Sequence, residues 1–256
     1  MQDLLNGAEL SRRLSDFSDL RVVYSDVCDS TNNEAKRMVA NGFSGNALLV
    51  AAEQTAGRGR RGRSFYSPPG SGVYFSVLYT TPEPLGNAVS VTCAASVAVM
   101  RAIRVCCGLQ TEIKWVNDIR YRDRKVCGIL TEAIRTDERT HIIVGIGVNL
   151  RRAEFPPELA GIAGSLDDGS TPRAALIAEC VRELIPFLRN LSSREWLDDY
   201  RAVSSVIGKE ITFTRGDAVI PALAVGIDHD GGLTVRTEAG EETLRTGEIT
   251  VRLAEK

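Results

Sequence analysis

The sequence contains few histidines and cysteines, the residues that most often hold zinc. It has two histidines and six cysteines among 256 residues, and no two of the cysteines form a Cys-x-x-Cys pair. Because a structural zinc site usually shows such close spacings, this composition argues against one. Cysteines without a disulfide pattern are typical of reduced, mostly buried thiols, so we expect a cytoplasmic protein.

The net charge is small, and long apolar runs are few. The formal net charge is −2, whereas a general nucleic-acid-binding protein usually has a broad basic face. The first residues show no signal-peptide pattern, and no stretch is expected to reach a transmembrane length. The longest nearly uncharged segment, 87–100, contains serine, threonine and asparagine, which predicts a buried helix. With 43% hydrophobic residues, the chain can form one large core, or a large and a small domain.

Hydrophobic periodicity predicts a first region that mixes helices and strands. Ser30, Thr31 and Glu34 resemble a capping box at the start of one helix, and Pro186 is expected to end or kink another. Strands after residue 112 are joined by short turns, which favours antiparallel pairing and an α+β domain. The predicted helices span 8–17, 33–40, 89–107, 172–190 and 193–203, and the predicted strands span 21–27, 47–54, 73–79, 112–115, 119–121, 125–134 and 142–150.

The sequence pattern changes from residue 208 onward. Short β-rich pieces alternate with glycine-containing turns, which is typical of a small barrel. These strands are predicted over 210–214, 218–228, 233–237, 242–245 and 249–253.

A loop rich in arginine and glycine, residues 57–63, is the most informative segment. It contains four arginines, three glycines and no carboxylate. Like charges on a glycine-loosened backbone repel one another, and arginine suits bidentate contacts to phosphate. The ordinary alternative is a solvated surface loop or a nucleic-acid tether. The two flanking apolar strands instead favour an active-site lid, because they fix the loop at both ends.

Four further polar clusters lie near predicted strand ends. Each alone has an ordinary structural explanation: a helix cap, a turn, an exposed lysine, or a glycine bulge in a strand. Together they would give one sheet face arginine, lysine, asparagine and open backbone. The clusters are Ser30-Thr31-Asn32, Lys114 to Asp118, Lys125 to Leu130, and Gly145 to Asn149.

In order and spacing, these segments resemble the biotin protein ligase family over about residues 22–150. The matching motifs are Ser-Thr-Asn, Gln-Thr-Ala-Gly-Arg-Gly-Arg-Arg-Gly-Arg, Lys-Trp-x-Asn-Asp, Lys-x-x-Gly-Ile-Leu and Gly-Ile-Gly-x-Asn. The resemblance implies a class II synthetase-like α+β catalytic domain over 1–205, with a mainly antiparallel sheet and flanking helices. It also implies a small SH3-like β-barrel over 206–256.

The resemblance implies a two-step reaction. Biotin and ATP form biotinyl-5′-AMP and pyrophosphate, and the biotinyl group then passes to a lysine of a biotin carboxyl carrier protein. Ser30, Gln54 and the backbone at Gly128 would bind the ureido group, and Gly145 and Gly147 would leave room for the ligand. The full implied biotin side comprises Ser30, Thr31, Asn32, Gln54, Gly57, Arg58, Gly59, Arg60, Phe65, Lys125, Gly128, Gly145 and Gly147.

The same resemblance implies the catalytic groups Lys125, Arg60 and Arg58. Lys125 would hold the carboxylate and the α-phosphate in line, while the arginines and Mg²⁺ neutralise phosphate charge. Asp118 is a candidate Mg²⁺ ligand. The Arg/Gly loop is expected to be disordered when empty and to order over the adenylate. The implied ATP side comprises Arg60, Arg61, Arg63, Lys114, Trp115, Asn117 and Asn149.

The sequence departs from the family pattern at three positions. Phe65 stands where tryptophan is usual, Val116 where proline is usual, and Cys127 where the residue is usually small and apolar. Phe65 can still form an aromatic wall, and Cys127 is expected to pack rather than react. About twenty residues precede the first strand, so we also expect no DNA-binding domain and no operator binding.

Three alternative functions remain. Lipoate ligases share the Lys-x-x-Gly motif, but their Arg-Arg-x-Ser-Gly-Gly-Gly signature is absent here. A nucleic-acid module is disfavoured by the net acidity and by the lack of interleaved aromatics. A non-catalytic biotin sensor is disfavoured by the intact Lys125 and arginines. No membrane partner is expected, whereas edge-strand docking of the carrier and homodimerisation by the same edge are both plausible.

Overall fold

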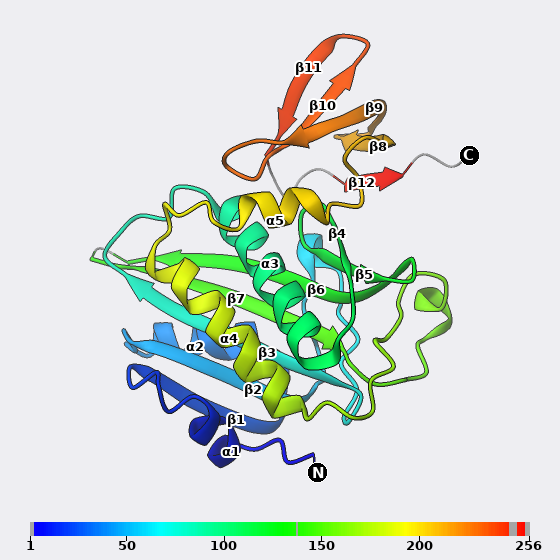
Figure 1. Cartoon of the computed structure of the whole chain (residues 1–256). Coiled ribbons are helices and arrows are strands. Elements are labelled where there is room, and N and C mark those ends of the chain that lie inside the picture. The colour runs from blue at the N-terminus through cyan, green and yellow to red at the C-terminus, as the bar shows by residue number, and fades with distance from the viewer. Residues whose placement is uncertain (1–2, 137, 246–249, 254–256) are drawn as a thin grey trace.

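The computed structural model describes residues 3–136, 138–245 and 250–253. It contains a large mixed sheet with helices on both faces and a smaller sheet at the C-terminal end, beyond helix α5 (Figure 1). This is the α+β architecture that the sequence predicts.

The large sheet has seven strands in the order β1-β2-β3-β7-β6-β5-β4. Strands β1 and β2 pair in parallel, and every other neighbouring pair is antiparallel, including the predicted run from β4 to β7. The strands are β1 (Leu20–Cys28), β2 (Asn46–Gln54), β3 (Gly72–Thr81), β4 (Glu112–Lys114), β5 (Asp118–Tyr121), β6 (Arg124–Arg135) and β7 (Thr140–Asn149).

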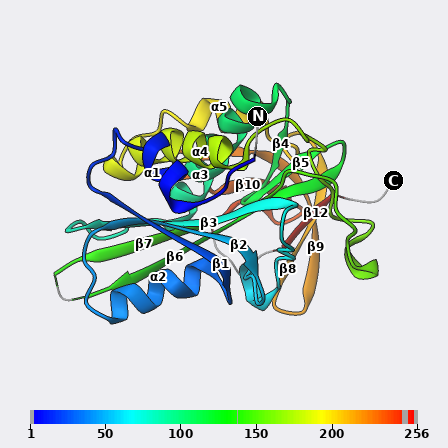
Figure 2. The ribbon, with the colours of Figure 1, turned by 90° about the horizontal axis from the view of Figure 1, so that it is seen from below.

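The main core lies between one face of this sheet and a helical layer. Helices α1 (Gly7–Arg13), α3 (Ala88–Cys107), α4 (Arg173–Arg189) and α5 (Leu197–Ala202) lie on that side, and α2 (Thr31–Ala40) lies on the other (Figure 2). Helix α2 packs on β2, β3 and β7 over a second, smaller cluster of apolar residues. It covers only part of its face, and the remaining part carries the predicted site.

Helix α3 corrects the expectation that no stretch reaches a transmembrane length. It has 20 residues, and of the described residues it alone is long and apolar enough to cross a membrane by length and composition. However, 72% of its apolar window is buried inside the molecule. Its apolar residues therefore pack in the protein core, which agrees with the buried helix that the sequence predicts for residues 87–100.

The capping signal fails at α2, whereas the helix predicted over 172–190 is observed and does not end at Pro186. Ser30 precedes α2 without a side-chain capping bond, and Glu34 pairs with Arg37, so the predicted capping box is wrong. Helix α4 continues through Pro186 to Arg189. Pro186 is exposed, so water can bond the carbonyl that lacks its N–H donor, while the buried Phe187 and Leu188 hold the last turn against the core.

The cysteines behave as packing residues. All six are free, and Cys93, Cys127 and Cys180 are buried while the other three are half-buried. Burial raises the pKa of the Cys127 thiol well above its usual range, so the thiol stays protonated at neutral pH. The prediction that Cys127 packs rather than reacts agrees with this environment.

The smaller sheet is antiparallel, with five strands in the order β11-β10-β9-β8-β12. Its strands are β8 (Glu210–Arg215), β9 (Ala218–Ile227), β10 (Leu233–Thr237), β11 (Gly240–Leu244) and β12 (Thr250–Leu253). Residue 249 of the predicted last strand, and residues 246–248 and 254–256 of the predicted barrel, lie outside the described residues.

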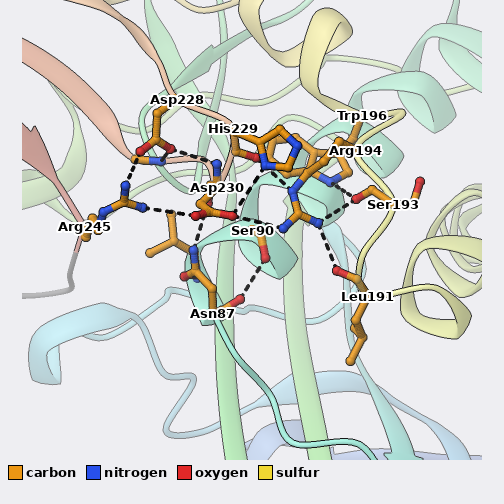
Figure 3. A network of polar contacts seen from close by, with 12 residues as sticks. Asn87, Ser90, Leu191, Ser193, Arg194, Trp196, Asp228, His229, Asp230 and Arg245 are labelled. Carbon is orange, nitrogen blue, oxygen red and sulfur yellow. Dashed lines mark hydrogen bonds and ion pairs between the residues drawn. The ribbon is translucent and has the colours of Figure 1, made fainter.

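A polar network joins the β9–β10 turn to the helical layer. Asn87 donates from Nδ2 to the Asp230 carbonyl at 2.9 Å, and Arg194 donates from Nη2 to the Asp230 carboxylate at 3.0 Å. Arg245 pairs with Asp228 on the other side of the turn (Figure 3). This network fixes the turn close to the start of α3.

Candidate active site

Two adjoining cavities lie where α2 leaves the sheet uncovered. The larger has a volume of about 620 Å³ and the smaller about 20 Å³. Both are lined by Arg58, Phe65, Gly128 and Leu130, so they meet beneath the Arg/Gly loop.

The predicted site residues line the two cavities, although Gly59, Arg60 and Lys125 of the implied biotin side line the larger cavity and not the smaller one. Ser30, Thr31, Asn32, Gln54, Gly145 and Gly147 line the smaller cavity. The larger cavity is lined by Gly59, Arg60, Arg61, Arg63, Lys114, Trp115, Asn117, Asp118, Lys125 and Asn149. Gly57 alone lines neither, because it is buried and packs against the backbone. A Cβ there would lie 2.4 Å from the Phe65 carbonyl oxygen.

The smaller cavity presents side chains that are already oriented. The Gln54 Oε1 atom accepts hydrogen bonds from the Thr31 backbone N–H at 2.9 Å and from the Thr31 hydroxyl at 3.2 Å. Its Nε2 atom donates to the Ser67 hydroxyl at 3.0 Å. Ser30 is buried and does not use its side chain to cap α2. These fixed polar groups suit a ligand with its own donors and acceptors.

Gly145 makes room for a side chain of the protein itself. A Cβ at Gly145 would lie 2.1 Å from the Oδ1 atom of Asn32. That oxygen accepts a hydrogen bond of 2.6 Å from the buried Ser76 hydroxyl. The expectation that Gly145 leaves space directly for a ligand is therefore wrong in this conformation, because Asn32 occupies that space.

Gly147 has the same relation to Phe65. A Cβ at Gly147 would lie 2.4 Å from the Phe65 ring, and a Cβ at Gly128 would lie 3.1 Å from it. The ring also packs edge-on against Tyr74, with centroids 6.4 Å apart. Phe65 thus forms the expected aromatic wall and stands between the two cavities.

Two polar pairs occupy the larger cavity. The Lys125 Nζ atom lies 2.6 Å from the Oδ1 atom of Asp118. The Arg60 Nη1 atom donates to the Oδ1 atom of Asn117 at 3.0 Å. Burial lowers the pKa of Arg60, opposed by the nearby Asp118 carboxylate, although a guanidinium remains charged at any physiological pH. The larger cavity therefore holds two cationic side chains, each with a polar partner.

The Arg/Gly loop is folded back on itself. The Gly59 N–H donates to the Arg63 carbonyl at 2.7 Å, and the Phe65 N–H donates to the Gly57 carbonyl at 2.8 Å. Arg61 and Gly62 at its tip have positive φ values of 60° and 72°, a conformation that glycine adopts without cost. The loop is thus a compact turn over the junction of the cavities; its expected disorder in the empty state stays a prediction.

Sequence reasoning missed several residues in or beside the site, among them Phe155, Ile162 and Glu132. Phe155 and Ile162 line the larger cavity from the segment after β7, and the Ile162 carbonyl accepts the Lys125 N–H at 2.9 Å. Glu132 lies four residues beyond Gly128 on β6, and therefore on the same face of the sheet. The β-strand period was the signal that could have identified Glu132.

The C-terminal sheet reaches the larger cavity through Trp115. The indole Nε1 atom of Trp115 donates a buried hydrogen bond of 2.9 Å to the Gly231 carbonyl. Gly231 has a φ of 84°, and a Cβ there would lie 2.9 Å from the Cys93 sulfur. The turn at Gly231 therefore fixes one wall of the larger cavity.

Comparison with known proteins gives two family matches. Residues 24–149 match the biotin/lipoate A/B protein ligase family, and residues 206–252 match the biotin protein ligase C terminal domain. A biotin--[acetyl-CoA-carboxylase] ligase from Paracoccus denitrificans is 34% identical over 243 residues, covering 86% of this chain and 96% of that protein.

This chain belongs to the biotin protein ligase family. It is a ligase, as the names of the family and of its relatives state. Another relative, the bifunctional ligase/repressor BirA of Bacillus subtilis, is 31% identical; the match covers 89% of this chain and 73% of that protein.

A solved biotin protein ligase structure shares the architecture. The enzyme of Aquifex aeolicus in complex with biotin and ATP superposes with a TM-score of 0.78 at 26% identity, covering 91% of this chain and 99% of that one. The biotin protein ligase fold therefore extends over both sheets of this chain.

Proposed function

We propose that this chain joins biotin to ATP and then transfers the biotinyl group to a lysine of a biotin carboxyl carrier protein. The observation that carries the proposal is the position of Lys125. Its ammonium group lies in the large cationic cavity, and its Nζ atom is 3.3 Å from the position that a Cβ on Gly128 would take. Gly128 lines both cavities, which supports a role for Lys125 in binding a carboxylate from one cavity and a phosphate from the other.

In the first step, a carboxylate oxygen of biotin attacks the α-phosphorus of ATP. The bond from that phosphorus to the bridging oxygen breaks, and pyrophosphate leaves with the electron pair. Lys125 is suited to hold the carboxylate and α-phosphate oxygens together, and Arg60 is suited to neutralise charge on the leaving group. Asp118, 2.6 Å from Lys125, orients the ammonium group before substrates arrive.

In the second step, the neutral amine of the carrier lysine attacks the acyl carbon of biotinyl-5′-AMP. The acyl C–O bond breaks, AMP leaves, and the amine loses its proton to solvent. The enzyme supplies no nucleophile, so its main task is to keep water from the mixed anhydride. The turn of the Arg/Gly loop and the ring of Phe65 are placed to do this.

One carboxylate in the site fits Mg²⁺. Mg²⁺ commonly binds through one or two carboxylates together with substrate phosphates, and Asp118 lines the larger cavity. In the part of the chain that the structure describes, no group of three or more His, Cys, Asp or Glu residues could hold a metal by itself. We therefore propose Asp118 as the protein ligand of Mg²⁺, which would add positive charge to the bound triphosphate.

The proposal extends to organisation and partners. We divide the chain into a catalytic domain over 1–205 and a barrel domain over 206–256, and we place the enzyme in the cytoplasm, where ATP and reduced thiols are found. The carrier is expected to present its lysine at the mouth of the larger cavity by pairing with a sheet edge. Homodimerisation by such an edge is part of the same proposal.

The test measures pyrophosphate release with ATP and Mg²⁺, comparing biotin with lipoate. We expect release with biotin alone, and a loss of at least a hundredfold in Lys125→Ala, since removing one stabilising contact to transition-state charge costs about 10²–10³ in rate. Lys209→Ala, outside both cavities, is the matched control. Release with lipoate alone would assign the lipoate reaction. Biotin binding without release would indicate a sensor, and salt-sensitive RNA binding without release would indicate a nucleic-acid module.

A further inference from the structure

Glu132 is a carboxylate beside the smaller cavity with three polar partners. Its Oε1 atom lies 2.7 Å from the Lys36 Nζ atom and 3.4 Å from an Arg58 nitrogen. Its Oε2 atom accepts a hydrogen bond of 2.9 Å from the Nδ2 atom of Asn32. One side chain on β6 therefore contacts two residues of α2 and one residue of the Arg/Gly loop.

Arg58 is the only one of these partners that belongs to the loop. Besides Glu132, its Nη1 atom donates to the Oδ1 atom of Asn33 on α2 at 2.8 Å. The Arg58 charge, expected at the pyrophosphate, is thus directed in this structure toward α2. On the opposite side of the turn, Arg60 is bonded to Asn117. The loop is consequently held at two points, one beside each cavity.

We propose that Glu132 is a positioning residue that holds Arg58 and so keeps the Arg/Gly loop closed against helix α2. Its role at the site of biotin activation rests on the proposed function. Lys36 and Arg58 share the same carboxylate oxygen, so they compete for its charge.

The charge that this role needs is present at neutral pH. Burial alone would raise the pKa of Glu132, but the hydrogen bonds from Lys36 and Asn32 outweigh it and hold the pKa below the usual value. The side chain is only 20% exposed, compared with 41% for Arg58. The anion is thus the fixed partner of the pair and the loop arginine is the movable one.

The test begins with Glu132→Gln in the full chain without ligands. A glutamine can still accept the Asn32 hydrogen bond, but its amide would direct donors at Lys36 and Arg58. The measurement is the rate of trypsin cleavage after Arg60, Arg61 and Arg63, followed by mass spectrometry. We expect cleavage to be about twofold to fivefold faster, the range for loss of a partly exposed ion pair, with no change in far-UV circular dichroism.

Lys36→Met is a control variant in which the change in loop cleavage rate should have the opposite sign. It removes the competing cation and leaves Arg58 as the nearest positive partner of Glu132, so loop cleavage should slow by a similar factor. A role limited to general stability predicts faster cleavage in both variants. An unchanged rate in Glu132→Gln, or faster cleavage in Lys36→Met, would overturn the proposal.

A double-mutant cycle identifies the residue through which Glu132 acts. In Arg58→Gln, the further change Glu132→Gln should alter loop cleavage by less than 1.5-fold, because its partner is already gone; a full effect would contradict the mechanism. Biotin affinity measured by calorimetry should fall in Glu132→Gln by the same twofold to fivefold. If the wild-type protein bound no biotin, the proposed function would fail, while the cleavage data would still decide the role of Glu132.

Discussion

Replacing Gly145 with alanine would test how the smaller cavity is built. The new methyl carbon would lie 2.1 Å from the Oδ1 atom of Asn32 and 2.8 Å from its Cγ atom, far inside contact distance. Asn32 cannot turn aside freely, because Ser76 and Glu132 bond its two amide atoms. The substitution must therefore either displace the Asn32 side chain or separate α2 from β7.

The expected cost follows from these contacts. Two hydrogen bonds lost at about 1 kcal/mol each, with about 1–3 kcal/mol for overpacking, give a destabilisation of about 3–5 kcal/mol. At about 2–4 °C per kcal/mol for a chain of this size, the melting temperature should fall by roughly 6–20 °C. Biotin affinity should fall as well, since Asn32 lines the cavity.

The assay combines thermal unfolding by circular dichroism with biotin titration by calorimetry. Gly226→Ala is the matched control, because Gly226 also lies in a strand and a Cβ there would meet nothing within 4 Å. In an Asn32→Ala background, Gly145→Ala should cost less than about 1 kcal/mol, because the clashing side chain is absent. An unchanged melting temperature and biotin affinity in Gly145→Ala would refute the packing argument.

Two further predictions concern the C-terminal contact and pH. Gly231→Ala should weaken ATP binding about tenfold and leave biotin binding unchanged, as measured by calorimetry, because the carbonyl that holds Trp115 must move. Gly208→Ala controls for backbone strain, because Gly208 has a similar positive φ of 76° and open space around it. An equal loss of ATP affinity in Gly208→Ala would contradict the argument. Burial alone would raise the pKa of Asp168, but hydrogen bonds from residues 170 and 171 hold it well below its usual value. The ionised group therefore stabilises the fold above about pH 4, and this stability is lost as the pH falls through the folded-state pKa. Asp168→Asn should cost roughly 1 kcal/mol in urea unfolding between about pH 5 and 8, and the difference should shrink below about pH 4; a difference that stays constant to pH 2 would contradict it.

The sequence predicted the order and type of the main elements because their apolar periods are strong. Strand β10 was predicted with its observed bounds, Leu233–Thr237, and the clusters at strand ends do meet on one face. The capping box at Ser30 failed because its signal is local, whereas Glu34 pairs with Arg37 one turn farther along the helix. Helix α4 was predicted over 172–190 and is observed over Arg173–Arg189; it does not end at Pro186, because tertiary packing holds its last turn.

The sequence correctly indicated a close approach to the sheet at Gly145 and Gly147, but it did not identify the approaching groups as protein side chains. A glycine in a strand indicates that something approaches the sheet closely, but not what approaches. At Gly147 it is the Phe65 ring and at Gly145 it is Asn32, so both glycines bring protein side chains close to the sheet beside a cavity. Since Asn32 and Phe65 both line the smaller cavity, the two glycines shape it indirectly, through side chains that α2 and the Arg/Gly loop supply. The fit of biotin should therefore depend on how those two segments lie against the sheet, which is the relation that Glu132 controls through its contacts with both.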